Sequence, residues 1–248
     1  MKRSGWVVLG VVLVVLGVFG LLGFLSGLNQ ETSTTDFDGV DEVVFDISNS
    51  SITFSTTEGQ TEVRTTRTTG FVGGNVSVEV DNGTLRIEQS CPLFFGFGCK
   101  ASFDVAVPAG TIISGATSNG AIGLDSTDGP VDVTTSNGAV NMSDVTSPLR
   151  VATSNGAIVG SNLGSETIEV RTSNGRIELD FAAVPELVRA RTSNGAIEIV
   201  LPADTPPVAL STSTSNGSVD ADIRTDPTAN VIVDAETSNG DITVRYGD

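Results

Sequence analysis

Hydrophobic and polar residues alternate with a period of two along most of the chain, most strictly around a tetrapeptide, Thr-Ser-Asn-Gly. This tetrapeptide occurs seven times between Thr117 and Gly240. A branched aliphatic residue always lies six positions before its asparagine, and Ile or Val always lies three positions after it. Such alternation predicts strands with one buried and one solvent-facing side. Each repeat is therefore predicted to be a strand, a sharp bend and a second strand.

The asparagines of the repeat are separated by 18, 18, 19, 20, 22 and 23 residues, a spacing typical of stacked repeats. Inward residues lie at even offsets before the asparagine and at odd offsets after it. This one-residue shift falls at Asn-Gly, where we expect glycine to adopt a positive φ. We predict a structural corner ladder made of these residues: Asn119, Asn137, Asn155, Asn174, Asn194, Asn216, Asn239, Gly120, Gly138, Gly156, Gly175, Gly195, Gly217 and Gly240.

Two architectures satisfy this pattern. One is an antiparallel β-hairpin array with type I′ turns at Asn-Gly. The other is an elongated, β-helix-like solenoid, in which identical side chains stack and hydrogen bond along the axis. A hairpin does not require the preceding Thr-Ser, so its recurrence favours an all-β fold with a β-solenoid of coils of about 18–23 residues. Seven coils would form a rod on the order of 30 Å long.

One substitution distinguishes the two architectures. If the amide of Asn174 is a buried member of the ladder, Asn174→Ala is expected to destabilise the protein by roughly 1–3 kcal/mol. Little or no change would indicate exposed hairpin turns.

The first 28 residues are predicted to be a short cytoplasmic tail and a transmembrane anchor. Lys2 and Arg3 precede an uncharged apolar segment, residues 6–25, which is long enough as a helix to span about 30 Å of hydrocarbon. It is longer than the apolar region of a cleaved signal peptide. The positive charges place the N-terminus in the cytoplasm and the rest of the chain outside the cell membrane. Residues 29–36 are polar and are expected to be a flexible tether.

Residues 37–248 are predicted to form the ectodomain, with divergent capping units over 37–102 and regular repeats over 103–248. The divergent units are centred on Asn49 and on Asn82-Gly83. The segment 91–99 interrupts the repeat, and Cys91 and Cys99 are expected to form a disulfide outside the membrane. The three phenylalanines in this loop either contact a partner or the membrane surface, or cover the open end of the solenoid: Phe94, Phe95 and Phe97.

The strand that ends in Val107-Pro108-Ala109-Gly110, followed by repeated Thr-Ser-Asn-Gly-x-Ile, resembles the putative-adhesin family of β-strand-repeat cell-surface proteins. The resemblance covers roughly residues 43–245. It implies a β-solenoid-like ectodomain displayed at the cell surface, without established catalytic residues.

The chain is strongly acidic, with 13 Lys and Arg against 30 Asp and Glu. Two of the basic residues lie in the N-terminal tail, which leaves the ectodomain with 11 against 30, a net charge of −19. Such a surface argues against nucleic acid or anionic lipid as a partner. It suits high salt, where the Debye length is about 3 Å at 1 M, and the hypothesis is a halophile's cell envelope.

Five sequons could accept a glycan: Asn49, Asn75, Asn82, Asn141 and Asn216. Three of them lie at bends, where a glycan would conflict with an inward-facing ladder. Asn75 is therefore the more suitable acceptor, and strand alternation places Asn141 on the solvent-facing side.

No motif for a specific chemistry is present. The chain has no histidine, and two cysteines cannot form a thiolate zinc site. Asp220, Asp222 and Asp226 could in principle form a glycosidase-like carboxylate pair, but alternation places them on the solvent-facing side. We therefore expect no catalytic residue, cofactor or metal site.

The leading functional hypothesis is a membrane-anchored structural or adhesive module that contacts a cell-surface protein, a glycan or another copy of itself. The first alternative is an envelope-stress or signalling accessory that acts through a membrane-protein partner. A second alternative is a polysaccharide-acting β-helix enzyme, which would require loss of activity on Asp→Asn changes at Asp220 or Asp222.

Overall fold

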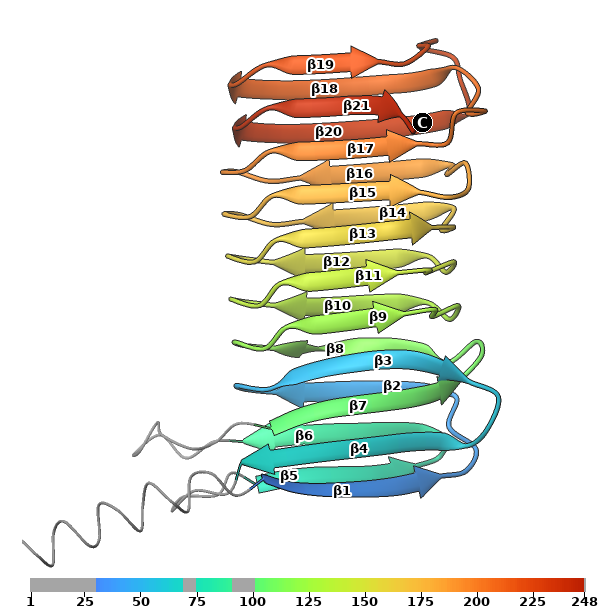
Figure 1. Cartoon of the computed structure of the whole chain (residues 1–248), viewed down its shortest axis with the longest axis vertical. Coiled ribbons are helices and arrows are strands. Elements are labelled where there is room, and N and C mark those ends of the chain that lie inside the picture. The colour runs from blue at the N-terminus through green and yellow to red at the C-terminus, as the bar shows by residue number, and fades with distance from the viewer. Residues whose placement is uncertain (1–29, 69–74, 91–100, 248) are drawn as a thin grey trace, which may run out of the picture.

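Two β-sheets face each other along the whole length of a rod (Figure 1). The structure is a computed structural model that describes residues 30–68, 75–90 and 101–247. These residues contain 21 strands. Sheet A has eleven strands, in spatial order β1 (Gln30–Phe37), β4 (Thr61–Thr68), β7 (Ala101–Pro108), β3 (Ser51–Thr57), β9 (Ile122–Asp125), β11 (Val140–Ser143), β13 (Ile158–Leu163), β15 (Ile177–Phe181), β17 (Ile197–Leu201), β21 (Ile242–Tyr246) and β19 (Val219–Asp222). Sheet B has ten, in spatial order β18 (Val208–Asn216), β20 (Val231–Asn239), β16 (Leu187–Arg191), β14 (Thr167–Arg171), β12 (Leu149–Thr153), β10 (Val131–Thr135), β8 (Ile112–Thr117), β2 (Glu42–Ile47), β6 (Thr84–Ser90) and β5 (Asn75–Asp81).

The repeats form a solenoid, as the sequence pattern predicts. Each coil crosses from sheet B to sheet A at its Asn-Gly corner and stacks on the next coil with parallel pairing. Equivalent residues of neighbouring coils pair with each other, so that Val131 pairs with Ile113 on one side and with Leu149 on the other. The hairpin array is therefore wrong for the repeats. The pairing of β13 with β15 shifts its register between Gly160 and Leu163. Sheet A has eleven strands, and at about 4.8 Å per strand the rod is about 48 Å long, longer than the seven repeats alone predict.

The core lies between the two sheets and is built from the inward-facing aliphatic positions. Ile122, Ile158 and Val188 are completely buried. The N-terminal part of the core is filled by larger side chains, with the rings of Phe45 and Phe54 5.6 Å apart. Burial of each such side chain contributes about 1.5–3 kcal/mol to the stability of the fold. The hydrophobic effect therefore favours the conformation in which the apolar residues of every coil face the core.

The coils do not stack in sequence order at either end. Near the N-terminal end, β2 pairs with both β6 and β8, so the coil β2–β3 lies between strands that follow it in the chain. At the other end, β20 lies between β16 and β18. The last coil of the chain, β20–β21, is thus inserted beneath the coil β18–β19, which forms the end of the rod (Figure 1).

Two N-terminal segments differ from the expectation. The predicted tether is instead ordered from Gln30 as strand β1, which pairs antiparallel with β4. The unit around Asn82-Gly83 is a true β-hairpin between β5 and β6, with φ of 51° and 82° at its two turn residues. Both values lie in the region that a type I′ turn requires. The unit around Asn49 is a solenoid corner between β2 and β3, as expected.

Several predictions concern residues outside the described ranges. These are the membrane anchor within residues 1–28, the disulfide between Cys91 and Cys99, and the contact loop with Phe94, Phe95 and Phe97. Across residues 30–68, 75–90 and 101–247, the structure contains no helix long and apolar enough to cross a membrane.

Candidate functional site

The corner asparagines form one continuous file of hydrogen-bonded amides. In each coil the asparagine Nδ2 donates to the Oδ1 of the asparagine in the preceding layer, over distances of 2.6 to 2.9 Å. The file includes Asn49 of the divergent unit and follows the spatial order of the coils: Asn49, Asn119, Asn137, Asn155, Asn174, Asn194, Asn239 and Asn216. All donors therefore point the same way along the rod.

The asparagine side chains lie on the outer surface of the corner, and the expectation of an inward-facing ladder was wrong. The buried polar residue of the corner is the threonine two positions earlier. Thr153 is 6% exposed, and its Oγ1 donates to the Gly138 carbonyl at 3.0 Å and accepts from the Gly156 N–H at 3.1 Å. The threonine thus satisfies two backbone groups that the bend removes from the sheets.

The corner glycines are required by close backbone contact rather than by a positive φ. Of the seven, only Gly240 has a φ in the positive region, at 159°. A Cβ on Gly138 would lie 1.7 Å from the Gly120 carbonyl oxygen, and one on Gly156 would lie 1.7 Å from that of Gly138. Successive corners therefore stack so closely that any side chain at this position would overlap the backbone of the layer beneath.

A second row of corners, on the opposite edge of the rod, was not predicted from the sequence. Ser126, Asp144 and Asn162 have φ of 56°, 55° and 52° and lie at the ends of β9, β11 and β13. The Asn162 amide donates to the Asp144 carboxylate in the adjacent layer. The three residue types differ, so only their common spacing of 18 residues could have indicated a repeated bend.

The three aspartates considered for catalysis do not form a catalytic pair. Asp220 and Asp222 are exposed on β19. Asp226 lies in the following turn and accepts hydrogen bonds from the Thr228 backbone N–H at 2.9 Å and hydroxyl at 2.7 Å. These bonds lower the pKa of Asp226 below its ordinary value, which is the opposite of what a general acid needs. Among the described residues, no group of three or more His, Cys, Asp or Glu could hold a metal ion.

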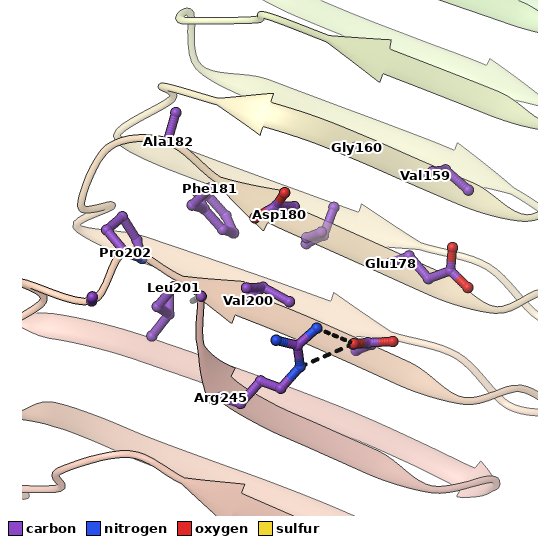
Figure 2. Close-up of a pocket in the computed structure, with 14 residues that line it drawn as sticks. Val159, Gly160, Glu178, Asp180, Phe181, Ala182, Val200, Leu201, Pro202 and Arg245 are labelled. Carbon is purple, nitrogen blue, oxygen red and sulfur yellow. Dashed lines mark hydrogen bonds and ion pairs between the residues drawn. The ribbon is translucent and has the colours of Figure 1, made fainter.

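An open groove of about 650 Å³ runs across the outer side of sheet A, over β13, β15, β17 and β21 (Figure 2). Its polar side chains include Glu178, Asp180, Glu198 and Arg245. Arg245 donates to the Glu198 carboxylate from both Nε, at 3.3 Å, and Nη2, at 3.1 Å. The groove therefore offers a shallow, acidic surface whose arginine is already paired, which suits weak surface contact rather than bond cleavage.

The outer face of sheet B carries a row of alternating charges, one from each of five consecutive strands. The row follows the register of the sheet: Asp132, Arg150, Glu169, Arg189 and Asp234. Glu169 lies between two arginines, at 3.0 Å from Arg150 and 2.9 Å from Arg189. Exposed pairs of this kind contribute at most about 1 kcal/mol each. These pairs therefore add little to stability, and the arginines of this row are engaged by carboxylates.

All five sequon asparagines have exposed side chains: Asn49, Asn75, Asn82, Asn141 and Asn216. The steric argument against the bends therefore does not hold, because the ladder faces outward.

The sequence model of one protein family, Toastrack DUF4097, matches residues 32–245. Among solved structures, a putative cell adhesion protein from Clostridium sporogenes is similar over 88% of this chain and 100% of its own, with 12% identity and a TM-score of 0.43. A putative adhesin from Bacteroides fragilis covers 89% and 98%, with 15% identity and a TM-score of 0.41. A putative lipid binding protein from Parabacteroides distasonis covers 89% and 98%, with 13% identity and a TM-score of 0.38. A search of curated proteins finds no significant match. The structural likenesses are too distant to assign a function.

Proposed function

The chain belongs to the Toastrack DUF4097 family, and on that premise we propose that it is a surface-displayed rod with a structural or adhesive role and no catalysis. In this proposal residues 6–25 anchor the chain in the cell membrane, the N-terminus lies in the cytoplasm and the rod lies outside. The partner is a cell-surface protein, a glycan or another copy of the chain.

The observation that carries this proposal is the position of the two ends of the rod. Strand β1, which begins five residues after the apolar segment 6–25, is the last strand of sheet A at one end, and β19 is the last at the other. A rod anchored through residues 6–25 would therefore hold the β18–β19 coil about 48 Å from its membrane-proximal end. Presentation of a surface at a fixed distance from a membrane is what a structural or adhesive module requires.

The side chains of the rod support a non-catalytic role. The corner asparagines and threonines use their polar groups to join one coil to the next. The arginine of the groove is paired with Glu198, and hydrogen bonds from Thr228 lower the pKa of Asp226. Repeated residues with the same partner in every layer serve the stability of the stack, since a catalytic site needs a singular arrangement of groups.

The experiment is crosslinking in intact cells that express the full chain, at their native salt concentration, followed by mass spectrometry of the captured proteins. Capture of surface glycoproteins or of the chain itself is expected. Capture of a membrane kinase, regulator or transporter instead would favour the signalling accessory and would overturn the adhesive role.

We also propose that the rod is adapted to high salt, because its net charge of −19 must be tolerated in a compact structure. Screening at molar salt shortens the Debye length to about 3 Å and removes most of the repulsion between exposed carboxylates. The unfolding temperature of the full chain in detergent is expected to rise between low and molar sodium chloride. A melting temperature that stays constant or falls would refute the adaptation.

A further inference from the structure

The end of the rod formed by β18 and β19 exposes residues that occupy core positions in every other repeat. Val219 lies three residues after its asparagine, and the equivalent residues in the other six repeats are at most 1% exposed. Val219 is 44% exposed, because none of the described coils stacks above it. Thr214, whose equivalents are buried, is likewise only half-buried. Within the described residues, the core is therefore covered only in part at this end: the segment after β19 bonds to Val208, whereas Val219 reaches the surface.

The same end carries two strands whose outer backbone edges are largely free. Among the described strands, β18 pairs with β20 and β19 pairs with β21. On the outer edge of β18, Val208 is bonded to the segment that follows β19: its N–H donates to the Arg224 carbonyl and its carbonyl accepts from the Asp226 N–H, both at 3.0 Å. β18 is nine residues long and contains no charged residue and no proline. Natural proteins usually blunt an exposed edge strand with charge, proline or a bulge, because a free edge pairs readily with another strand. The other edge strands follow that rule, since each of them contains two carboxylates: Glu31 and Asp36 in β1, Glu79 and Asp81 in β5, and Asp220 and Asp222 in β19.

We propose that this end binds the same end of a second copy of the chain, with β18 of each copy paired antiparallel to β19 of the other. The inference rests on the proposed function and names its partner. A partner must present two strand edges about 10 Å apart that run in opposite directions, as β18 and β19 do (Figure 1). A two-fold rotation of the same end supplies both edges at once, which is the geometry of an isologous interface.

Charge decides which strands pair. β19 carries Asp220 and Asp222, whereas β18 is uncharged. Pairing β19 with β19 would bring four carboxylates together on one sheet, and like charges directly opposite one another destabilise a strand pair. Pairing β18 with β19 places the two pairs of aspartates on opposite sheets. In the same arrangement the inward residues Leu210 and Val219 of one copy cover those of the other, and the core becomes continuous through both rods.

The consequence is contact between two membranes by identical rods joined end to end. Two rods of about 48 Å would separate the membranes by on the order of 100 Å. Because both copies are acidic, the association is expected to strengthen as salt increases.

The test uses the full chain reconstituted in liposomes, with clustering of the liposomes measured by light scattering at molar salt. Val219→Lys places a charge on the proposed interface. Ile232→Lys is the matched control, because Ile232 is also 44% exposed but lies on the outer face of sheet B. Liposomes with the wild type and with Ile232→Lys are expected to cluster, and those with Val219→Lys are expected to lose clustering. Clustering by Val219→Lys, or no clustering by the wild type, would overturn the proposal.

A photo-crosslinking amino acid at position 219 or 232 of the full chain, used on the clustered liposomes, identifies the contact. Position 219 is expected to give a homodimer linked to residues 208–216 of the second copy, and position 232 is expected to give none. Equal dimer yields at both positions, or links outside the β18–β19 coil, would overturn the proposal. If crosslinking in cells captures other surface proteins while these two tests fail, the adhesive function stands and the self-association falls.

Discussion

The close stacking of the corners predicts a severe effect of one methyl group. In Gly156→Ala the added Cβ would lie 1.7 Å from the oxygen and 2.5 Å from the carbon of the Gly138 carbonyl, and 2.9 Å from the Ala139 nitrogen. All three atoms belong to the backbone, so no side chain can move aside to relieve the overlap. Two adjacent coils must therefore separate at the corner.

The magnitude follows from the contacts that such a separation breaks. Between these two coils, Thr153 Oγ1 donates to the Gly138 carbonyl at 3.0 Å, Asn155 Nδ2 donates to Asn137 Oδ1 at 2.7 Å, and the Asn155 N–H donates to the Ser136 carbonyl at 2.9 Å. Three hydrogen bonds at about 1 kcal/mol each, together with about 1–3 kcal/mol for overpacking, give a destabilisation of about 5 kcal/mol. This is a large share of the about 5–15 kcal/mol that stabilises a typical domain.

Gly59→Ala is the matched control, because a Cβ at this position meets nothing closer than Thr57 Oγ1 at 3.7 Å. The control is expected to stay within about 1 kcal/mol of the wild type, or to be slightly more stable through the entropy of the unfolded chain. The assay is urea unfolding of the full chain in detergent, followed by far-ultraviolet circular dichroism. A Gly156→Ala variant as stable as Gly59→Ala would refute the steric role of the corner glycines.

Three further predictions concern the corner. Thr153→Val should lower the free energy of unfolding in urea by about 2–4 kcal/mol, because it leaves a buried glycine carbonyl and a buried glycine N–H without partners. Thr153→Ser keeps the hydroxyl and should lose less stability. Asn174→Ala should lower the free energy of unfolding by about 1 kcal/mol, the lower end of the range expected from the sequence, because water can replace the amide at this exposed position. A loss of stability above about 3 kcal/mol would contradict an exposed ladder. Hydrogen bonds from the Ser218 N–H and hydroxyl lower the pKa of Asp241 below its ordinary value of 3.8. The stabilisation that these bonds give the folded protein is therefore complete above pH 3.8. It is lost as the pH falls through the lower pKa that Asp241 has in the folded state. The melting temperatures of wild type and Asp241→Asn should therefore differ at pH 7 and converge in acid, and a constant difference would refute the linkage.

The repeat unit could be predicted from sequence because its pattern reports burial directly. Strand alternation, the position of the corner and the stacked architecture all follow from residues that recur at fixed offsets from asparagine. The reason for the glycine could not be predicted, because a positive φ and a close backbone contact both select glycine. The outward direction of the asparagines was also hidden, since an amide ladder can form on either side of a bend.

The ends of the rod were harder to predict for a different reason. Identical corners can stack in any order, so the repeat does not specify that Asn239 lies between Asn194 and Asn216. The only signal was the longer spacing of 22 and 23 residues in the last repeats, which provides the extra chain needed to pass over one layer. The polar composition of residues 29–36 also concealed β1, because an edge strand with both faces wet has no hydrophobic alternation.

Staining of the two termini in intact cells shows directly whether the rod is displayed at the cell surface. The full chain would carry one peptide tag before Lys2 and another after Asp248, and each would be stained with an antibody before and after permeabilisation. Staining of the C-terminal tag on intact cells, with the N-terminal tag visible only after permeabilisation, is the result that a surface-displayed rod predicts. A C-terminal tag that remains hidden until the membrane is permeabilised would contradict it.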